Sequence, residues 1–167
     1  MVEEAVGLAG ADVSAPQEKR AVVTITIGEK FWRLASVTHP LLRRYADSCG
    51  ADFIVLDDPK LTGTLGRPTY ERFRLHEILD QYDRAIFVDT DILVALDAPN
   101  MFDMVPKAVL GAVSEEVYDM AGRDKSVTQE VLGPVQWKNP YFNAGMMVLS
   151  REHRAIFDID NPDLKYW

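Results

Sequence analysis

The chain has 167 residues, a length typical of one domain, and 47% of them are hydrophobic. Its formal charge of -8 argues against a protein that binds nucleic acid or an anionic membrane, because both contacts need a basic face. An acidic protein can still bind a diphosphate when a metal cation mediates the contact. The composition therefore predicts one soluble globular domain with no nucleic-acid partner.

The sequence also predicts the compartment. Cys49 is the only cysteine, which excludes an intrachain disulfide and is typical of a reducing environment. No apolar run approaches the ~18 residues of a transmembrane segment. Glu3 and Glu4 stand where a signal peptide carries positive charge. We therefore expect a cytoplasmic protein with a flexible arm over residues 1–20 and one domain over residues 21–167.

Apolar runs and helical periodicity predict alternating strands and helices in the first half of the chain. In chain order we expect a strand at 21–27, a helix at 29–49 that Pro40 kinks or splits, a strand at 53–56, a loop at 57–68, a helix at 70–82 and a strand at 85–88. Further on we expect an apolar strand at 92–96, a helical turn at 101–105, a strand at 108–113, a long polar loop at 114–140, a strand at 145–149 and the start of a helix at 151–157. This order predicts an α/β fold with a mostly parallel sheet flanked by helices.

Two aspartates follow the strand at 85–88 directly, in the sequence Asp89-Thr90-Asp91. In an extended segment side chains alternate between two faces, so both carboxylates would point the same way. Carboxylates paired with phosphate oxygens suit Mg²⁺ or Mn²⁺. Open α/β sheets bind ligands at the carboxyl ends of their strands. The position of the pair therefore favours a metal site.

Two alternatives compete with this interpretation of the aspartates. A D-x-D sequence alone is also typical of a plain turn with solvated carboxylates. A strand followed by D-x-D also opens phosphatases resembling the haloacid dehalogenases, where the first Asp is a nucleophile. Those enzymes place the motif after the first strand and usually have Thr or Val next, whereas Ile92 follows here and the motif lies mid-chain.

Several segments, in the same order, resemble glycosyltransferase family 8, which includes glycogenin and bacterial lipopolysaccharide galactosyltransferases. YDRAIFVDTDILV (82–94) resembles the D-x-D region, TYERFRL (69–75) the helix before it, and NPYFNAGMMVLS (139–150) the segment that lines the donor-sugar pocket. VTITIGEKF (23–31) is similar to the uracil-binding first strand. The resemblance covers about 21–157 and implies a GT-A-like, Rossmann-type fold.

The resemblance implies a donor site and its residues. Asp89 and Asp91 would be ligands of Mn²⁺ or Mg²⁺ that holds a UDP-sugar. The residues that would contact this donor are Thr26, Ile27, Gly28, Phe31, Arg72, Thr90, Asn143, Ala144 and Gly145. Among them Phe31 would stack on the base and Arg72 would reach the sugar. No residue is assigned as the catalytic nucleophile.

The residue chemistry agrees with these roles without requiring them. Asn143 offers both a donor and an acceptor for a sugar hydroxyl, and Gly145 permits a close approach or a positive φ. Both also fit a plain turn into a strand. Phe31 fits the core of a helix as well as a stacking role. Arg72 can bind phosphate or sugar oxygens, but a solvated arginine is the simpler interpretation, and its neighbour Arg74 is expected to be solvated.

Two elements of the family pattern are missing from the sequence. The family has a D-Q region beyond Y-F-N-x-G and a C-terminal H-x-x-G-x-x-K-P-W, whose His completes the metal shell and whose Lys holds the diphosphate. The sequence is therefore either a fragment of a longer enzyme or a minimal, divergent member. The apolar Leu164, Tyr166 and Trp167 at its end favour the fragment.

The function that the resemblance implies is metal-dependent transfer of a hexose from a UDP-sugar to an acceptor hydroxyl, with retention of configuration. A non-catalytic domain that binds the metal and the nucleotide sugar is the alternative. The sequence does not identify the acceptor, which can be a glycan, a lipid-linked molecule or a protein. It also leaves open whether the protein forms a homo-oligomer.

Overall fold

The computed structural model describes residues 17–116, 121–134, 136 and 140–160. Most of the arm expected at 1–20, together with Leu164, Tyr166 and Trp167, lies outside these residues. The strands are β1 (Arg20–Ile25), β2 (Asp52–Leu56), β3 (Arg84–Val88), β4 (Gly111–Ser114) and β5 (Phe142–Ser150). The α-helices are α1 (Glu29–Ser48), α2 (Thr62–Leu65), α3 (Leu75–Gln81), α4 (Met101–Met104) and α5 (Ala121–Leu132), and the 3-10 helices are η1 (Pro68–Arg74) and η3 (Arg151–Phe157).

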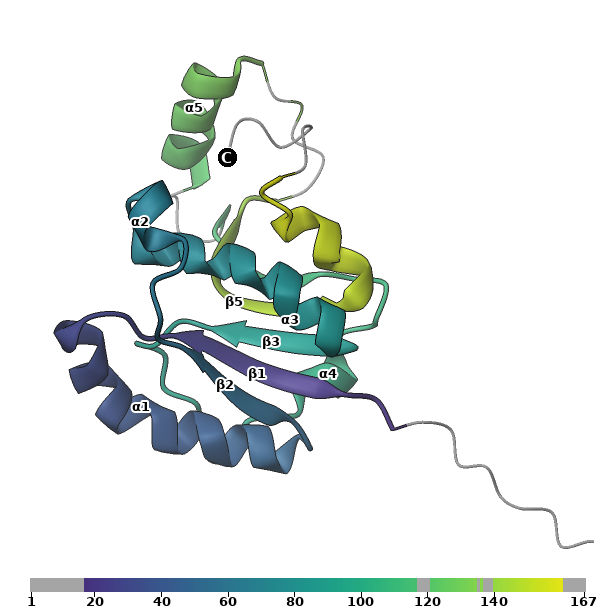
Figure 1. Cartoon of the computed structure of the whole chain (residues 1–167). Coiled ribbons are helices and arrows are strands. Elements are labelled where there is room, and N and C mark those ends of the chain that lie inside the picture. Colours follow the sequence, from purple (N-terminus) through teal and green to yellow (C-terminus); the bar gives the residue numbers. More distant parts are fainter. Residues whose placement is uncertain (1–16, 117–120, 135, 137–139, 161–167) are drawn as a thin grey trace, which may run out of the picture.

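The five strands form one mixed sheet in the order β2-β1-β3-β5-β4 (Figure 1). β1 pairs in parallel with both β2 and β3, whereas β5 runs antiparallel to its neighbours β3 and β4. Four strands therefore share one direction, and the prediction of a mostly parallel sheet flanked by helices is confirmed.

Helices cover both faces of this sheet, as strands buried on both sides require (Figure 1). On one face the buried side chains of Val23 and Phe87 pack with α3 and η3. On the other face Val22 and Ile86 pack with α1 and α4. The alternation along β1 and β3 thus fills two cores from consecutive residues.

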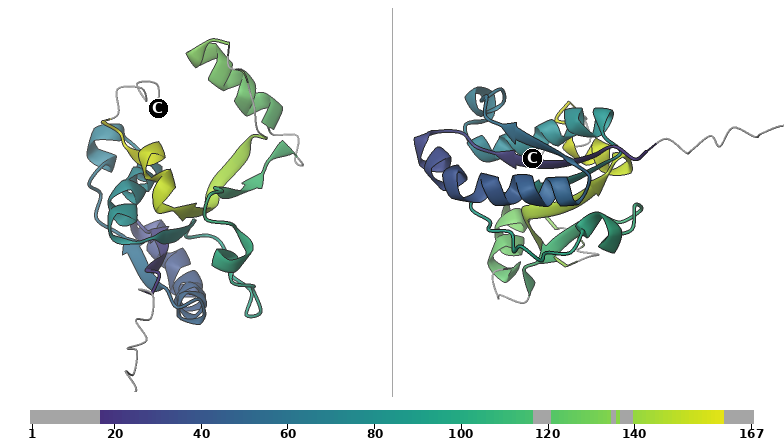
Figure 2. Two further views of the ribbon diagram at one scale, coloured as in Figure 1. Left: turned by 90° about the vertical axis from the view of Figure 1, so that its right-hand side faces the viewer. Right: turned by 90° about the horizontal axis from the view of Figure 1, so that it is seen from below.

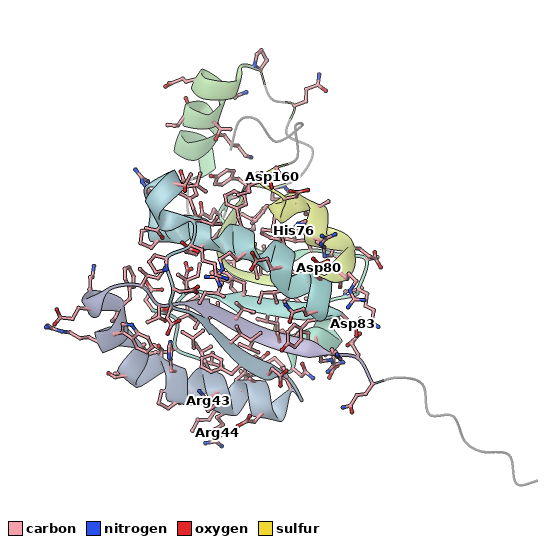
Figure 3. The ribbon with its side chains drawn as sticks, viewed as in Figure 1. Arg43, Arg44, His76, Asp80, Asp83 and Asp160 are labelled. Atoms are coloured by element: carbon pink, nitrogen blue, oxygen red, sulfur yellow. The ribbon has the colours of Figure 1, made fainter. Side chains whose placement is uncertain are left out.

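Polar contacts join the two helices on the first face, α3 and η3. Arg154 of η3 pairs through Nε with Asp80 Oδ1 at 2.7 Å, and its Nη2 lies 2.7 Å from His76 Nε2. Figure 3 labels His76 and Asp80 on α3, beside η3. α5, in contrast, projects away from the sheet (Figures 1 and 2).

Several expected elements differ from the structure. α1 is not split at Pro40, since buried residues on both sides of it, Ala35 and Leu42 among them, hold one helix against the sheet. The helix expected at 70–82 is two, η1 and α3. The strand expected at 92–96 is absent from a segment that the structure describes in full, and α5 lies within the expected loop at 114–140.

Among the residues that the structure describes, no helix combines the length and the apolar character needed to cross a membrane.

The two-faced core predicts a contrast between two leucines. Leu149 of β5 is fully buried, whereas Leu93 is 64% exposed. Leu149→Ala should lower the free energy of unfolding by about 2–5 kcal/mol, the usual effect of a cavity in a core. Leu93→Ala should change it by less than about 0.5 kcal/mol. Urea denaturation checks both, and equal effects for the two variants would contradict this packing.

Candidate functional site

The pairing of β3 with β5 brings two of the sequence motifs together. Val88 lies opposite Met146 in the antiparallel ladder, and the backbone N–H of Asp89 continues the ladder by donating to the carbonyl of Gly145 at 2.7 Å. β5 starts at the edge of the sheet where the parallel strands end. Residues 89–91 and 143–145 therefore meet at this edge, although more than fifty residues separate them.

The segment Asp89-Thr90-Asp91 is a turn and not the extended strand that was expected. The N–H of Ile92 donates to the carbonyl of Asp89 at 3.1 Å, which reverses the chain after β3. The side chain of Thr90 is buried, while Asp89 is half-buried and Asp91 exposed. The two carboxylates are electrostatic neighbours: burial raises the pKa of Asp89, Arg72 opposes the rise, and the charge of Asp91 adds to it.

Arg72 lies beside the first aspartate. Its Nη2 donates to Asp89 Oδ1 at 3.0 Å, and its guanidinium packs 4.8 Å from the centre of the Phe87 ring. Its Nε is buried and has no hydrogen-bond partner. The structure therefore places Arg72 at the site, with one donor engaged by Asp89 and another without an acceptor. Asp89 keeps 40% of its side-chain surface exposed, so a ligand can still reach this carboxylate.

Gly145 is a glycine because of close packing and not because of its φ angle. A Cβ there would lie 2.7 Å from Asp89 Oδ2 and 2.7 Å from Asn143 Oδ1. The N–H of Gly145 donates to Asn143 Oδ1 at 2.6 Å, which turns the asparagine back along its own strand. The absence of a side chain thus lets Asp89 Oδ2 and Asn143 Oδ1 lie close against the backbone of Gly145.

Glu115 is a site residue that the sequence motifs did not indicate. Its Oε1 accepts a hydrogen bond of 2.7 Å from Asn143 Nδ2. The side-chain amide of Asn143 is thereby held at both ends, by Glu115 and by the N–H of Gly145. Glu115 follows β4, and only the pairing of β4 with β5 brings it near Asn143.

The other expected donor residues divide into two groups. The side chains of Thr26 and Thr90 are buried and bonded to each other, Oγ1 to Oγ1 at 3.0 Å, so a donor contact at either residue would involve its backbone. Ile27 is half-buried and Gly28 is exposed, with a φ of 89° that favours glycine. Phe31 is 37% exposed near the start of α1, so its ring is available for stacking.

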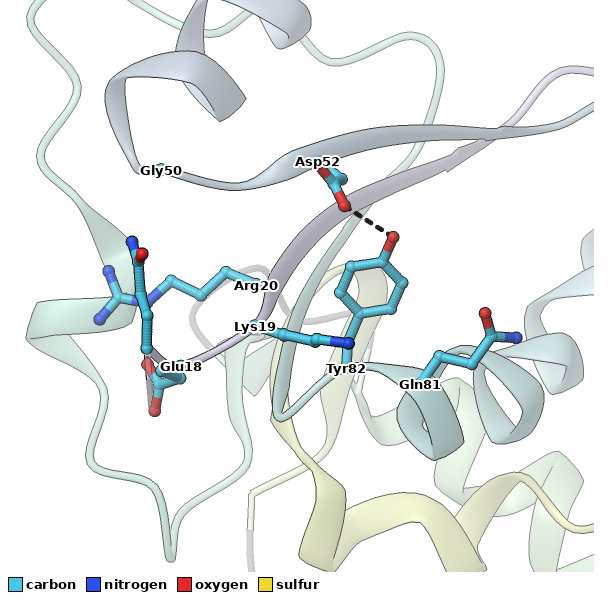
Figure 4. Close-up of a pocket in the computed structure, with 8 residues that line it drawn as sticks. Glu18, Lys19, Arg20, Gly50, Asp52, Gln81 and Tyr82 are labelled. Atoms are coloured by element: carbon cyan, nitrogen blue, oxygen red, sulfur yellow. Dashed lines mark hydrogen bonds and ion pairs between the residues drawn. The ribbon is translucent and has the colours of Figure 1, made fainter. Parts of the chain in front are cut away.

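A cavity of about 230 Å³ adjoins Arg72 and Ala144. Its other lining residues are Thr69, Tyr70, Phe73, Leu110, Phe142, Met147, Ile156 and Phe157. A larger cavity, of about 430 Å³, lies at the opposite end of β1 among Glu18, Lys19 and Tyr82 (Figure 4). None of the expected metal-binding or donor-binding residues lines that second cavity, so the candidate site is at the carboxyl edge.

A buried carboxylate holds η1, which carries Arg72, in place. Glu71 is fully buried, and its Oε1 accepts from the N–H of Leu61 at 2.7 Å and from the N–H of Thr62 at 2.6 Å. Burial raises the pKa of Glu71, but hydrogen bonds from Thr62 and Leu61 outweigh it, and the pKa is lowered. Glu71 therefore ties η1 to the preceding segment at Leu61 and Thr62.

Arg74 is not the solvated residue that was expected. It is only 8% exposed, and its Nη1 pairs with Asp58 Oδ1 at 2.7 Å and with Glu71 Oε2 at 3.5 Å. An arginine so enclosed needs these partners, because an unpaired buried charge is costly. The two arginines of η1 therefore have different tasks: Arg74 anchors the helix, and Arg72 faces the aspartates.

The residues at the edge fit a divalent cation in part. Asp89 and Asp91 supply carboxylate oxygens, and both carboxylates are accessible, Asp89 with 40% of its side chain exposed. Within the described part of the chain, however, no group of three His, Cys, Asp or Glu side chains is arranged to hold a metal. A hard cation here would take its remaining ligands from phosphate oxygens, from water or from further protein residues.

The sequence pattern of glycosyl transferase family 8 matches residues 23–156, most of the chain. The chain belongs to this family, which removes the phosphatase alternative. No curated protein matches it in sequence.

Solved structures share the fold. A glycosyltransferase involved in glycosylation of the major capsid of PBCV-1 is similar with a TM-score of 0.54 and 14% identity over 84% of this chain and 64% of that one. The bifunctional glycosyltransferase WbbM is similar with a TM-score of 0.60 and 17% identity, over 83% of this chain and 32% of that one. The active-site mutant Q189E of LgtC is similar with a TM-score of 0.51 and 17% identity, over 79% of this chain and 57% of that one. The chain thus spans about a third to two thirds of these proteins.

The close packing at Gly145 predicts the effect of one methyl group. Gly145→Ala should push Asp89 and Asn143 apart, lower the stability by about 1–3 kcal/mol and weaken Mn²⁺ binding. Gly63→Ala is the control, because a Cβ at Gly63 meets nothing within 4 Å. Thermal melts and calorimetry measure both effects. If Gly145→Ala behaves like Gly63→Ala, the close approach is not needed.

The lowered pKa of Glu71 predicts a pH-dependent stability. Its charge should stabilise the fold fully above its ordinary pKa of 4.5 and lose this effect as the pH falls through the lowered folded-state value. At pH 7 Glu71→Gln should cost roughly 1–3 kcal/mol, and the gap to wild type should narrow below pH 4.5. Urea denaturation from pH 7 to 3 measures it, with the exposed Glu130→Gln as control. A gap that does not vary with pH would refute the assignment.

Proposed function

We propose that the chain forms the donor-binding half of a metal-dependent glycosyltransferase that transfers a hexose from a UDP-sugar to an acceptor hydroxyl. The observation that carries the proposal is the meeting of Asp89, Arg72 and Asn143 at one edge of the sheet, next to the exposed Asp91. Membership of glycosyl transferase family 8 supports the reaction class.

Arg72 and the aspartates have complementary parts in binding the donor. Asp89 and Asp91 would hold Mn²⁺ or Mg²⁺, which as a Lewis acid neutralises charge on the departing diphosphate. Arg72 keeps 22% of its side chain exposed, and its planar guanidinium is suited to phosphate or sugar oxygens. Its packing on Phe87 limits its motion, so it is oriented before the donor arrives.

Asn143 would orient the sugar. Glu115 and the N–H of Gly145 fix its amide, so that its remaining donor and acceptor positions have one direction. A sugar held in one orientation presents its anomeric carbon to an acceptor in a defined geometry. Ala144, beside the cavity of about 230 Å³, has a small side chain that leaves room for the sugar.

The nucleotide would lie along the end of β1. Gly28 is exposed and caps α1, since its carbonyl accepts from the N–H of Phe31 at 3.1 Å. The half-exposed ring of Phe31 offers an apolar face for the base. Retention of configuration and a cytoplasmic location are part of the same proposal and rest on the family resemblance and the composition.

The metal site predicts a sharp difference between two exposed carboxylates. Asp91→Asn should weaken Mn²⁺-dependent UDP binding by about tenfold or more, equivalent to about 1.4 kcal/mol or more. It should leave the melting temperature unchanged, because Asp91 is exposed. Asp47→Asn, an exposed carboxylate on α1, is the matched control and should bind as wild type does. Calorimetry of UDP with and without Mn²⁺ measures the affinity.

The result that would remove the proposal is an Asp91→Asn isotherm identical to that of wild type. Release of UDP from a UDP-hexose then distinguishes an enzyme from a non-catalytic binding domain. Turnover would show an enzyme, whereas binding of the UDP-hexose without turnover would support a non-catalytic domain.

A further inference from the structure

The side chain of Thr90 anchors the aspartate turn from below. It is 4% exposed, and its hydroxyl donates to the carbonyl of Ile25 at the end of β1. The same oxygen lies 3.1 Å from Thr24 Oγ1 and 3.0 Å from Thr26 Oγ1. Three hydrogen bonds thus hold the middle residue of the turn to the end of β1 and to Thr26, the residue that follows it, while the aspartates on either side are half-buried or exposed.

The proton count of this cluster fixes the direction of each bond. A hydroxyl has one proton and two acceptor lone pairs. The carbonyl of Ile25 can only accept, so the proton of Thr90 goes there. Thr24 and Thr26 must then both donate to Thr90. Having used its proton, Thr26 can only accept from any further partner.

That further partner is His39 of α1. Its Nε2 lies 3.0 Å from Thr26 Oγ1, so the count requires Nε2 to carry a proton. The rings of Trp32 and Phe53 meet the imidazole edge to face, at 5.9 and 5.4 Å between centroids. These two contacts fix the plane of the ring and direct Nε2 toward Thr26.

We propose that His39 is a positioning residue of the donor site, whose Nε2–H begins a hydrogen-bond chain through Thr26 and Thr90 that holds the Asp89–Asp91 turn in its metal-binding conformation. The chain of bonds stands on the geometry alone. Its effect on metal and nucleotide affinity rests on the proposed function. Burial and the charge of Arg43 both lower the pKa of His39, so the ring is neutral at pH 8 and its single proton has a definite place.

The first test is made on the wild-type protein, and a variant serves only to assign its signals. Long-range ¹H–¹⁵N correlation spectra of the histidine rings at pH 8 distinguish the two neutral tautomers. The proposal predicts the Nε2–H form for His39, assigned by the signals that disappear in His39→Gln. The Nδ1–H form would overturn it, because Thr26 would then donate to His39 and leave Thr90 without one of its donors.

Two variants give the second test. His39→Phe keeps an aromatic ring for Trp32 and Phe53 but has no donor, whereas His39→Gln loses the ring and keeps an N–H where Nε2 stood. A positioning role predicts that His39→Phe weakens Mn²⁺-dependent UDP binding by about tenfold and that His39→Gln keeps most of the wild-type affinity. A purely structural role predicts the reverse order. The reverse order, or wild-type affinity for His39→Phe, would overturn the proposal.

The amide signals of residues 89–91 separate this inference from the proposed function. They should shift in His39→Phe and return toward wild-type positions in His39→Gln, whether or not any ligand binds. If wild type fails to bind Mn²⁺ and UDP while these shifts follow the predicted order, the donor-site function fails and the hydrogen-bond chain stands. If the signals are unshifted in both variants, the proposed series of hydrogen bonds from His39 to Thr90 is refuted.

Discussion

The register between β3 and β5 is the constraint on which the site depends. Side chains alternate along a strand, so a slip of one residue would move every side chain of β5 to the other face. Met147 and Leu149 are buried with α3 and η3, and Val148 is buried with α1, which excludes such a slip. The same register puts the carbonyl of Gly145 against the N–H of Asp89. Core packing thereby sets the geometry at the edge of the sheet.

Charge balance explains how a half-buried aspartate is tolerated at that edge. Burial alone would favour the neutral form of Asp89, and the guanidinium of Arg72 opposes this effect. The position of Arg72 depends on η1, which Glu71 and Arg74 fasten to the preceding loop. A cation between the aspartates would compete with Arg72 for Asp89, and the guanidinium would then be available to the donor. The same arginine would thus balance the charge of Asp89 without a cation and contact the donor once a cation is bound.

Much of this arrangement could be predicted from the sequence, because strands buried on both faces are continuous apolar runs and the motif spacing indicates the family. Contacts between distant residues could not. In the sequence Thr90 stands between two aspartates and would be expected to be exposed. In the structure it is buried and bonded to the hydroxyls of Thr26 and Thr24, which lie 64 and 66 residues earlier in the chain. Arg74 is enclosed by Asp58, and Pro40 is tolerated because the buried face of α1 continues past it. Local patterns record propensity, whereas these outcomes come from tertiary packing.

The central claim is that one divalent cation binds beside Asp89 and Asp91, and paramagnetic broadening by Mn²⁺ tests it most directly. Substoichiometric Mn²⁺ with UDP, added to ¹⁵N-labelled protein, should first remove the amide signals of residues 89–91 and 143–145. Signals of Lys19 and Tyr82, at the opposite end of the sheet, should persist. Selective loss at Lys19 and Tyr82, or uniform loss across the spectrum, would contradict the account.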